Sequence, residues 1–362
     1  MHRARLALAV AAAAAIILSA PFISRISEAI KAACPGHFVR ILASAAGASV
    51  ALAIVLAVIR IRSRRAVRYT CIAAAVAGAV MYSLWTSSPD PQVAAVERFH
   101  FLEYGLLTFL FYRAWRPLND GGVLLLPVLA AMITGTVEEW FQWFIPGRVG
   151  TFDDVFLNWV AIACGLLFSV GIDPPDHGLQ RLGRRAILHA GAAAVLFILV
   201  FGAFFDSVHV GHVITAQGTG SFTSLYTEEG LSAEARDREA RWSSGAPIVR
   251  TSLSREDQYR TEGIQHVAER NEAWAAGDFA TAWRENAILE RYYEPVLNTG
   301  HRWPAEQRLD AERRASAVAI EPGRYMSRAY PYEIYAWPSW SYWSVVGGLA
   351  LAMLLLARRA GR

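Results

Sequence analysis

The sequence predicts an all-α integral membrane protein, with about eight transmembrane helices and an inserted, mainly helical extracytoplasmic domain between the last two. Three observations predict this class. Of 362 residues, 54% are hydrophobic and only 18% are charged, whereas a soluble domain carries about 25% charge. The apolar residues gather in runs close to the roughly 20 residues that a membrane helix needs. Residues 207–338, in contrast, read like a soluble domain, with 15 Arg against 19 Asp plus Glu.

The apolar runs place the spans, and the arginines orient them. Candidate spans are 5–24, 39–60, 67–85, 97–115, 122–144, 153–172, 186–206 and 339–357. Arginines gather in alternate loops, at 60–68, at 113–116, at 181–185 and at 358–362. Because positive charge stays on the cytoplasmic side, we expect both termini to be cytoplasmic. The first span could instead be a signal peptide, but its apolar run is long and Leu18-Ser19-Ala20 is a poor cleavage site.

This topology divides the chain into five predicted parts. They are N-terminal spans (1–94), a polar membrane core (95–172), a cytoplasmic loop with the seventh span (173–206), the extracytoplasmic domain (207–338) and the last span with its basic tail (339–362). Aromatic residues mark the return to the membrane interface, where such rings collect. They are Tyr330, Tyr332, Tyr335, Trp337, Trp340, Tyr342 and Trp343. Trp140, Phe141, Trp143 and Phe144 are expected in the same interfacial belt.

Composition and motifs also exclude several classes of function. The three cysteines form no C-x-x-C pair, and the soluble segment has none, which excludes a disulfide scaffold and disfavours a cysteine zinc site. The sequence contains no G-x-S-x-G, H-E-x-x-H or P-loop motif. The basic residues do not form a patch on one compact domain, so nucleic acid is not an expected partner. We expect no cofactor and no bound metal.

Polar residues gather at the outer ends of three consecutive spans, where charge is costly and usually has a function. The fourth span opens with Glu97, His100 and Glu103, the fifth closes with Glu138, Glu139 and Gln142, and the sixth opens with Asp153, Asp154 and Asn158; Arg148 lies in the turn Ile145-Pro146-Gly147-Arg148. Helical spacing places His100 on one face with Tyr104, Glu139 with Gln142, and Asp154 with Asn158. The candidate pocket is therefore lined by His100, Glu103, Glu139, Gln142, Arg148, Asp154 and Asn158.

These residues resemble a known family. The run His100-Phe101-Leu102-Glu103-Tyr104, the block from Glu139 to Arg148, and Asp154-x-x-x-Asn158 with Gly165 are similar to the VanZ-like membrane proteins. The resemblance covers about 95–170 and departs from the family at Ala161, where the family often has glycine, and at Glu97-Arg98. It implies a cell-envelope membrane protein. The founding member is associated with glycopeptide antibiotic resistance, and the family brings no established reaction.

Each polar residue also has a purely structural interpretation. Glu139 and Arg148 could form an ion pair that pins the turn, and Asp153 and Asp154 could cap the sixth helix. His100, Glu139 and Asp154 are suitable zinc ligands, but no short-range ligand pair such as His-x-x-x-His accompanies them. A metal or catalytic role is therefore disfavoured against an ion pair or a site for a lipid headgroup or sugar.

The soluble segment has two parts. Residues 207–250 are rich in Gly, Ser and Thr and allow short strands, whereas 255–318 read as helical. Within the helical part, about 269–296 weakly resembles a single tetratricopeptide-type hairpin, turning at Gly277-Asp278, without a second copy. Trp274, Trp283, Tyr292 and Tyr293 are its expected core, with a sugar-stacking surface as the alternative.

Three functions remain open. The first is a non-enzymatic envelope protein that presents an outer-leaflet polar pocket to a lipid-linked or glycan ligand, with Arg148 as the partner for a phosphate or carboxylate. The second is a membrane enzyme acting on a lipid or cell-wall precursor, with Glu139 or His100 as acid–base group. The third is a scaffold that docks another envelope protein through 255–318. A transporter is disfavoured because the polar groups lie away from the midplane.

Overall fold

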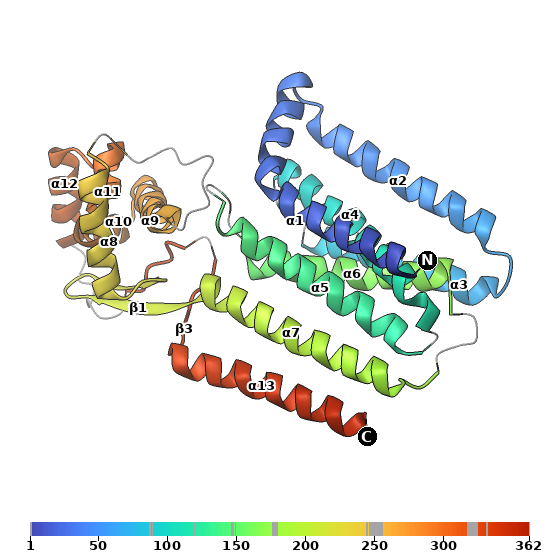
Figure 1. Cartoon of the computed structure of the whole chain (residues 1–362). Coiled ribbons are helices and arrows are strands. Elements are labelled where there is room, and N and C mark those ends of the chain that lie inside the picture. The colour runs from blue at the N-terminus through green and yellow to red at the C-terminus, as the bar shows by residue number, and fades with distance from the viewer. Residues whose placement is uncertain are drawn as a thin grey trace. The chain divides into compact units, whose positions relative to one another are not determined.

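The computed structural model describes residues 2–361, except for 87, 89, 119, 146–147, 149, 176–179, 244, 246–255, 317–324 and 331. The chain forms two compact units (Figure 1). Unit 1 comprises Met1–Gln142, Val149–Phe204 and Trp343–Arg362, and unit 2 comprises Trp143–Arg148 and Phe205–Tyr342. The turn after α5 thus belongs with the soluble segment rather than with the helices that flank it in the chain.

Unit 1 is a bundle of long helices, which confirms the predicted all-α membrane fold. Its helices are α1 (His2–Ala33), α2 (Phe38–Arg60), α3 (Arg65–Trp85), α4 (Pro91–Trp115), the short η1 (Arg116–Leu118), α5 (Gly122–Gln142), α6 (Phe152–Ile172), most of α7 (Arg184–His209) and α13 (Ser339–Ala360). Seven helices among the described residues are long and apolar enough to cross a membrane. The predicted span 97–115 falls on α4, which is long enough but carries Glu97, Arg98, Glu103 and Arg113.

Helix α4 packs in the middle of unit 1, against α1, α2, α5 and α6. Its buried side chains Tyr104, Leu107 and Phe111 meet small residues of the neighbours, Ala131 on α5 and Ala161 on α6. Small residues let helix backbones approach closely in a membrane. This central position explains how a helix with several charges is held among apolar neighbours.

Helices α4 and α6 approach each other closely at Gly105 and Gly165, but only one of the two glycines has room for a side chain. A Cβ on Gly165 would lie 2.7 Å from the Gly105 Cα, whereas a Cβ on Gly105 would lie 4.0 Å from the Gly165 Cα. We expect Gly165→Ala to destabilise unit 1 by about 1–3 kcal/mol, because the backbone must move apart. Thermal unfolding in detergent measures this, with Gly105→Ala as the matched control that should unfold like the parent. Equal losses in both variants would contradict the geometry.

The other end of α6 is capped by side chains from α3, α4 and η1. Arg68 donates from Nε to the Gly171 carbonyl at 2.8 Å and from a terminal nitrogen to the Ile172 carbonyl. Tyr112 donates to the Asp173 carbonyl at 2.7 Å, and Arg116 forms an ion pair with the Asp173 carboxylate at 3.0 Å. These groups satisfy the carbonyls that every helix leaves open at its C-terminus. Arginines from two predicted loops therefore meet at one end of the bundle.

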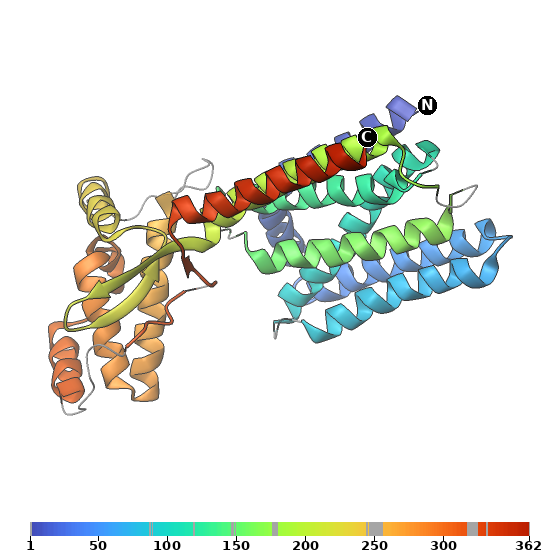
Figure 2. The ribbon, with the colours of Figure 1, turned by 90° about the horizontal axis from the view of Figure 1, so that it is seen from below.

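Unit 2 combines a small sheet with helices (Figure 2). Its elements are β1 (Val210–Ala216), β2 (Gly220–Ser224), α8 (Glu228–Arg241), α9 (Glu256–Ala276), α10 (Phe279–Tyr292), α11 (Glu294–Val296), the π-helical turn η2 (Leu297–His301), α12 (Ala305–Ser316) and β3 (Tyr335–Ala336). The sheet order is β2-β1-β3, with β1 antiparallel to β2 and parallel to β3. The composition of 207–250 predicts that short strands are possible there, and β1 and β2 confirm this.

Helices α9 and α10 form the predicted hairpin. Gly277 adopts φ +79°, which favours glycine, and the Asp278 side chain accepts the Thr281 N–H to cap α10. Tyr292 and Tyr293 lie in the core as expected. Trp274 and Trp283 are only half-buried, so their assignment to the core was wrong. Trp274 instead packs against Phe279 and Trp303, because α12 covers that side of the hairpin.

The interior of unit 2 is built around a fully buried carboxylate, Glu262 on α9. Its two oxygens accept five hydrogen bonds, from Ser224 Oγ (2.7 Å), the Leu225 N–H (3.1 Å), Gln258 Nε2 (2.9 Å), Tyr293 OH (2.7 Å) and Tyr330 OH (2.6 Å). These donors come from β2, α9, the end of α10 and the segment before β3. Since a buried carboxylate is costly unless its oxygens are satisfied, this shared acceptor joins all four parts.

A polar stripe on α9 continues from this carboxylate. Gln258, Glu262, His266 and Arg270 recur at every fourth residue and are all buried. His266 bonds Glu285 at 2.6 Å, and Tyr325 also donates to Glu285. Arg270 donates to the Asn286 side chain at 3.0 Å and to the His301 carbonyl at 2.9 Å. The stripe lies beside apolar residues of the same helix, since Tyr259 and Val267 belong to the hydrophobic core of unit 2.

The predicted aromatic cluster divides into two groups. Trp337, Trp340 and Trp343 are exposed, as interfacial residues would be. Tyr330 and Tyr332 instead direct their hydroxyls to Glu262 and Gln258 inside unit 2. Trp143 is likewise only 6% exposed and packs edge-on against Tyr332. These three residues therefore pack within unit 2, and their placement in the interfacial belt stays a prediction.

The buried tyrosines give unit 2 a predictable sensitivity to alkali. Burial, followed by the nearby Glu262 carboxylate, raises the pKa of the Tyr293 and Tyr330 phenols well above the usual 10. Unfolded phenols ionise first, so the stabilisation is complete below about pH 10 and is lost as pH rises through the folded pKa values. We expect unit 2 to unfold steeply above about pH 10, followed by circular dichroism of the full chain. Tyr293→Phe should make the transition less steep, and an unchanged slope would contradict this origin.

Candidate functional site

Unit 1 gathers polar side chains where α4 begins, α5 ends and α6 begins. The structure brings together His100 and Tyr104 from α4, Glu138, Glu139 and Gln142 from α5, and Asn158 from α6. We call these six residues and Glu103 the polar cluster. Of these, Glu138, Glu139, Gln142 and Asn158 are buried, whereas His100 and Glu103 are half-buried. The cluster therefore has an enclosed side, formed by α5 and α6, and a more open side on α4.

His100 and Asn158 join α4 to α6. His100 Nδ1 lies 2.8 Å from Asn158 Oδ1, so the imidazole donates from Nδ1 and keeps Nε2 as its second polar atom. Asn158 is fully buried, and its Nδ2 has no hydrogen-bond partner within the described part of the chain. A buried amide that lacks a partner costs free energy. Asn158 is thus the one donor on the enclosed side that still needs an acceptor among the described residues.

The carboxyl groups lie on the α5 side. Gln142 Nε2 donates to Glu138 Oε1 at 2.7 Å and to Glu139 Oε1 at 3.2 Å, and Tyr104 OH lies 3.4 Å from Glu138 Oε2. Glu103, half-buried on α4, lies near His100 and Glu138. Three carboxyl groups therefore share one end of the bundle, and acceptors outnumber donors in the cluster.

Gly135 makes room for these contacts. A Cβ on Gly135 would lie 3.1 Å from the Tyr104 ring and 3.3 Å from Asn158 Cβ. Both distances are tighter than ordinary van der Waals contact, so a larger residue would push α4 or α6 away. Gly135 and Tyr104, together with Glu138, were not among the predicted pocket residues. The spacing Glu138-x-x-x-Gln142 could have identified Glu138, since residues four apart share a helix face.

Asp154 has a local role in the structure. Thr151 is the N-cap of α6 and accepts the Asp154 N–H, while its hydroxyl donates to Asp154 Oδ2 at 2.9 Å. Asp154 thus holds the side chain of the N-cap residue in place at the start of α6, which agrees with the capping interpretation. Asp153 is exposed. Neither aspartate is brought into contact with His100 or Glu139 by the hydrogen bonds described above.

Arg148 belongs to unit 2, whereas Glu139 belongs to unit 1. The backbone N–H of Arg148 donates to the Ile145 carbonyl at 3.0 Å, which closes part of the turn. The predicted Glu139–Arg148 ion pair and the phosphate-binding role of Arg148 stay predictions. Pro146 and Gly147, expected to form the turn, lie outside the described residues. Over the described ranges, no three His, Cys, Asp or Glu side chains are placed to hold a metal ion.

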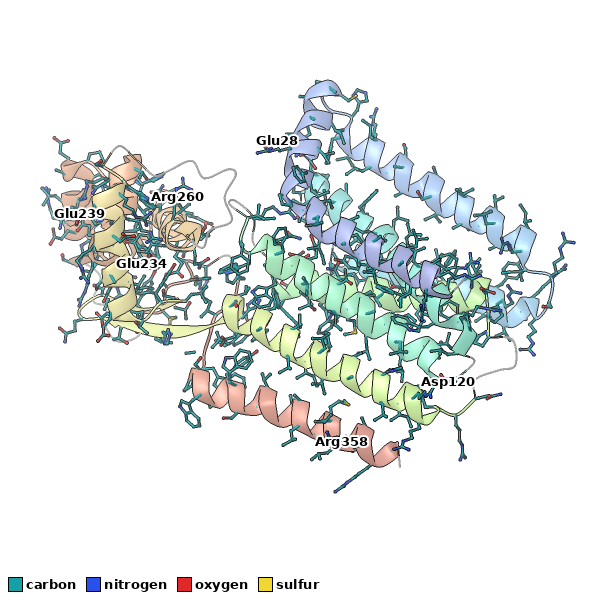
Figure 3. The ribbon with its side chains drawn as sticks, in the orientation of Figure 1. Glu28, Asp120, Glu234, Glu239, Arg260 and Arg358 are labelled. Carbon is teal, nitrogen blue, oxygen red and sulfur yellow. The ribbon has the colours of Figure 1, made fainter. Side chains whose placement is uncertain are left out.

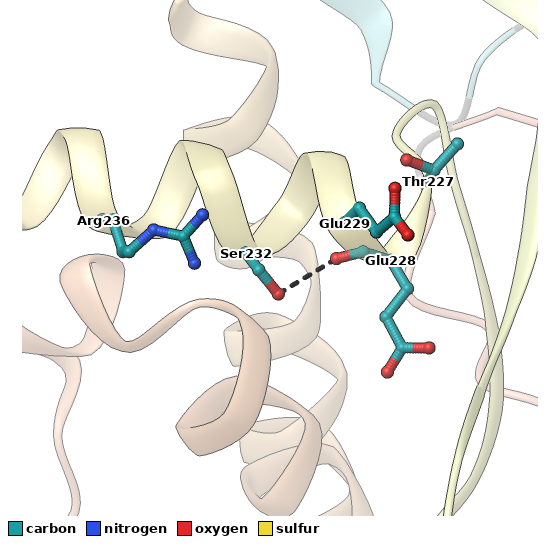
Figure 4. A pocket seen from close by; sticks show the side chains of 5 residues that line it. All are labelled: Thr227, Glu228, Glu229, Ser232 and Arg236. Carbon is teal, nitrogen blue, oxygen red and sulfur yellow. Dashed lines mark hydrogen bonds between the residues drawn. The ribbon is translucent and has the colours of Figure 1, made fainter.

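A hollow in unit 2 lies beside the first turns of α8 (Figure 4). It is lined by Thr227, Glu228, Glu229, Ser232 and Arg236. Thr227 caps α8, and Ser232 donates to the Glu228 carbonyl at 3.0 Å. Further along α8, Glu234 is half-buried and pairs with Arg238, whereas Glu239 is exposed (Figure 3). Because Thr227, Glu228, Glu229 and Arg236 are exposed, the hollow is a solvated surface rather than an enclosed site.

Comparison with known families supports the resemblance found in the motifs. Residues 52–172 match the family model described as VanZ/LLP1. The match ends with α6, and it begins within α2, earlier than the expected start near 95. The earlier start is consistent with the packing, since α3 lies against α6 and α2 against α4. Neither the curated proteins nor the solved structures give a match to the chain.

Proposed function

We propose that this multi-pass membrane protein, whose residues 52–172 are VanZ-like, binds a lipid-linked or glycan ligand of the cell envelope at its polar cluster. The observation that supports this most is the convergence of polar side chains from three helices at one end of the bundle. Polar groups inside membrane helices are costly and usually line a site. A non-enzymatic role is the simplest, and a link to glycopeptide resistance follows from the family.

The chemistry of the cluster favours a ligand with several hydroxyl groups. Glu103, Glu138 and Glu139 offer carboxyl oxygens as acceptors, and a sugar supplies donors to match. Asn158 Nδ2 is a buried donor that lacks a partner among the described residues, and a ligand oxygen would satisfy it. In this proposal the cluster faces the outer leaflet, with unit 2 extracytoplasmic and both termini cytoplasmic. Arg148 would bind a phosphate or carboxylate of the ligand.

Binding by the purified full chain tests the proposal. Native mass spectrometry in detergent would compare phosphatidylglycerol, phosphatidylethanolamine, a lipid-linked disaccharide precursor and soluble cell-wall glycan fragments. We expect a sugar-bearing ligand to bind, and Glu139→Gln or Asn158→Ala to weaken binding about tenfold, the effect of one lost buried hydrogen bond. Asp153→Asn, on the exposed face of α6, is the control. Absence of binding to every probe, or an equal loss in the control, would refute the proposal.

One observation favours an enzyme as the second candidate. The hydrogen bond from His100 Nδ1 to Asn158 leaves Nε2 of the neutral imidazole as a proton acceptor on the half-buried side of the cluster. A general base needs this arrangement. An enzyme acting on a lipid or cell-wall precursor should lose turnover in both His100→Gln and Glu139→Gln. Full retention of the cellular phenotype by Glu139→Gln would exclude this candidate.

A further inference from the structure

The loop between α2 and α3 gathers arginines that have no acidic partner among the described residues. The loop consists of residues 61–64, because α2 ends at Arg60 and α3 begins at Arg65. Four exposed arginines lie in the loop and at the two helix ends that it joins, and we call them the arginine cluster: Arg60, Arg62, Arg64 and Arg65. Positions 29–89 contain no Asp or Glu. Four positive charges therefore stand together without a neighbouring carboxylate in the sequence.

The loop is held in one conformation by the helices around it. Ile61 is 1% exposed and packs into a small apolar cluster with Ala57 of α2 and Ile72 of α3. One turn into α3, Arg68 caps the end of α6 through the Gly171 and Ile172 carbonyls. Positive charge that only orients the spans needs no fixed shape, so that role does not account for a loop anchored on both sides.

The backbone of Arg64 shows that the arginines do not serve the stability of α3. Its φ is +47°, and Arg64 is the one non-glycine residue with positive φ in the described part of the chain. Glycine adopts this conformation readily, whereas a residue with a side chain is strained in it. Arg64 and Arg65 also begin α3, where positive charge opposes the helix dipole, and Arg64 makes no side-chain capping bond. Local helix chemistry would thus favour glycine or an acidic residue here.

Exposed apolar side chains flank the arginine cluster on both helices. On α2, Val58 and Ile59 are each 59% exposed, and on α3, Val67 is 67% exposed. Both helices are long and apolar enough to cross a membrane, so the arginines at their joined ends lie at the level of lipid headgroups. An anion bound there meets guanidinium groups beside its charge and apolar side chains beside any attached chain. This combination fits an anionic amphiphile better than free inorganic phosphate.

We propose that residues 60–65 form a binding site for the headgroups of anionic phospholipids. Each guanidinium is planar and presents paired N–H donors that match two phosphate oxygens. Basic residues beside a membrane span attract anionic headgroups, and each contributes about fivefold in affinity. Attachment to a lipid also explains why the loop is anchored by Ile61: the guanidinium groups are presented at a fixed depth.

This lipid site is separate from the polar cluster. Arg68, one turn into α3, contacts the C-terminal end of α6, whereas the polar cluster gathers where α6 begins. Helix α6 has 21 residues, so the two sites lie about 30 Å apart along it. They share no residue, and the lipid site stands or falls independently of the proposed sugar-bearing ligand.

Native mass spectrometry of the full chain, titrated with phosphatidylglycerol in detergent, tests the lipid site. The double variant Arg62→Gln/Arg65→Gln is expected to bind phosphatidylglycerol about 20- to 30-fold more weakly. Phosphatidylcholine has no net charge and should bind parent and variant alike. The double variant Arg358→Gln/Arg359→Gln is the matched control, because it removes the same charge from the last turn of another candidate span, α13, and should leave the affinity nearly unchanged.

A single substitution keeps the test independent of folding. Arg64→Gly removes one guanidinium and relieves the backbone, so its melting temperature should equal or exceed that of the parent while phosphatidylglycerol binds about fivefold more weakly. The proposal is supported if both loop variants lose affinity and the α13 control does not. It is overturned if the control loses as much as Arg62→Gln/Arg65→Gln, if Arg64→Gly binds like the parent, or if inorganic phosphate alone displaces the lipid.

Discussion

Replacing Glu262 by alanine is expected to lower the melting temperature of unit 2 by roughly 10–20 °C. The carboxylate accepts five hydrogen bonds while fully buried. Its removal leaves the Leu225 N–H without its acceptor and takes one of two acceptors from the Gln258 amide, which also donates to Tyr330 OH at 3.0 Å. It also opens a space beneath Tyr293 and Tyr330. Loss of one member of a buried charged network costs about 3–5 kcal/mol. Differential scanning fluorimetry of the full chain in detergent, with a fluorescent probe in unit 2, measures the shift in melting temperature.

Two further variants separate this network from a general effect of charge on α9. Glu262→Gln keeps one carboxamide oxygen and should fall between the parent and Glu262→Ala, because the serine and tyrosine hydroxyls can reverse direction but the Leu225 N–H cannot. Glu272→Ala removes an exposed carboxylate from the same helix and should change the melting temperature little, since surface charges contribute about 0–1 kcal/mol. A Glu262→Ala melting temperature close to that of Glu272→Ala would show that the five bonds contribute little.

The second large effect is expected at Gly150, next to the polar cluster. In Gly150→Ala the new Cβ would lie 2.0 Å from the Glu139 carbonyl oxygen and 2.8 Å from its carbon. Both are backbone atoms, so no side-chain rotation can relieve the overlap, and either α5 or the start of α6 must move. Overpacking of this kind costs about 1–3 kcal/mol or more. We expect lower thermal stability of unit 1 and faster hydrogen exchange at Glu138–Gln142.

Gly348→Ala provides the comparison for that variant. Gly348 lies on α13 and has open space where a Cβ would be placed, so alanine there should be neutral or slightly stabilising. A Gly150→Ala protein that matches Gly348→Ala in stability and exchange would mean that the turn accommodates a side chain without disturbing Glu139.

The sequence was sufficient for much of unit 1. Hydropathy predicts the positions of the helices, and residue types with their spacing indicate His100, Gln142 and Asn158. Helical spacing shows which side chains share a face of one helix. It does not show which faces meet, so the pairing of His100 with Asn158 and of Tyr104 with Glu138 required the structure. The position of Gly135 between them is a property of three packed helices and has no signature in α5 alone.

Unit 2 was less predictable for a specific reason. The oxygens of Glu262 are shared by residues as far apart in sequence as Ser224 and Tyr330, and spacing rules do not reach such separations. The stripe from Gln258 to Arg270 resembles a solvated helix face when read locally, since buried charged residues are rare. The contacts of Tyr330 and Tyr332 could not be predicted for the same reason. A tyrosine near a membrane span has an interfacial preference, whereas its hydrogen bonds to Glu262 and Gln258 join residues that are distant in the sequence.

The pairing of β1 with β3 bears on how the soluble segment could be gained in evolution or removed by design. Val210 pairs with Tyr335 and Gly211 with Ala336, so the two points where the chain enters and leaves the soluble segment lie side by side, about 4.8 Å apart. Domains with adjacent termini are readily gained or removed as modules. A variant in which a short flexible linker replaces residues 212–334 should therefore still connect α7 to α13. This minimal transmembrane protein can then be compared with the full chain.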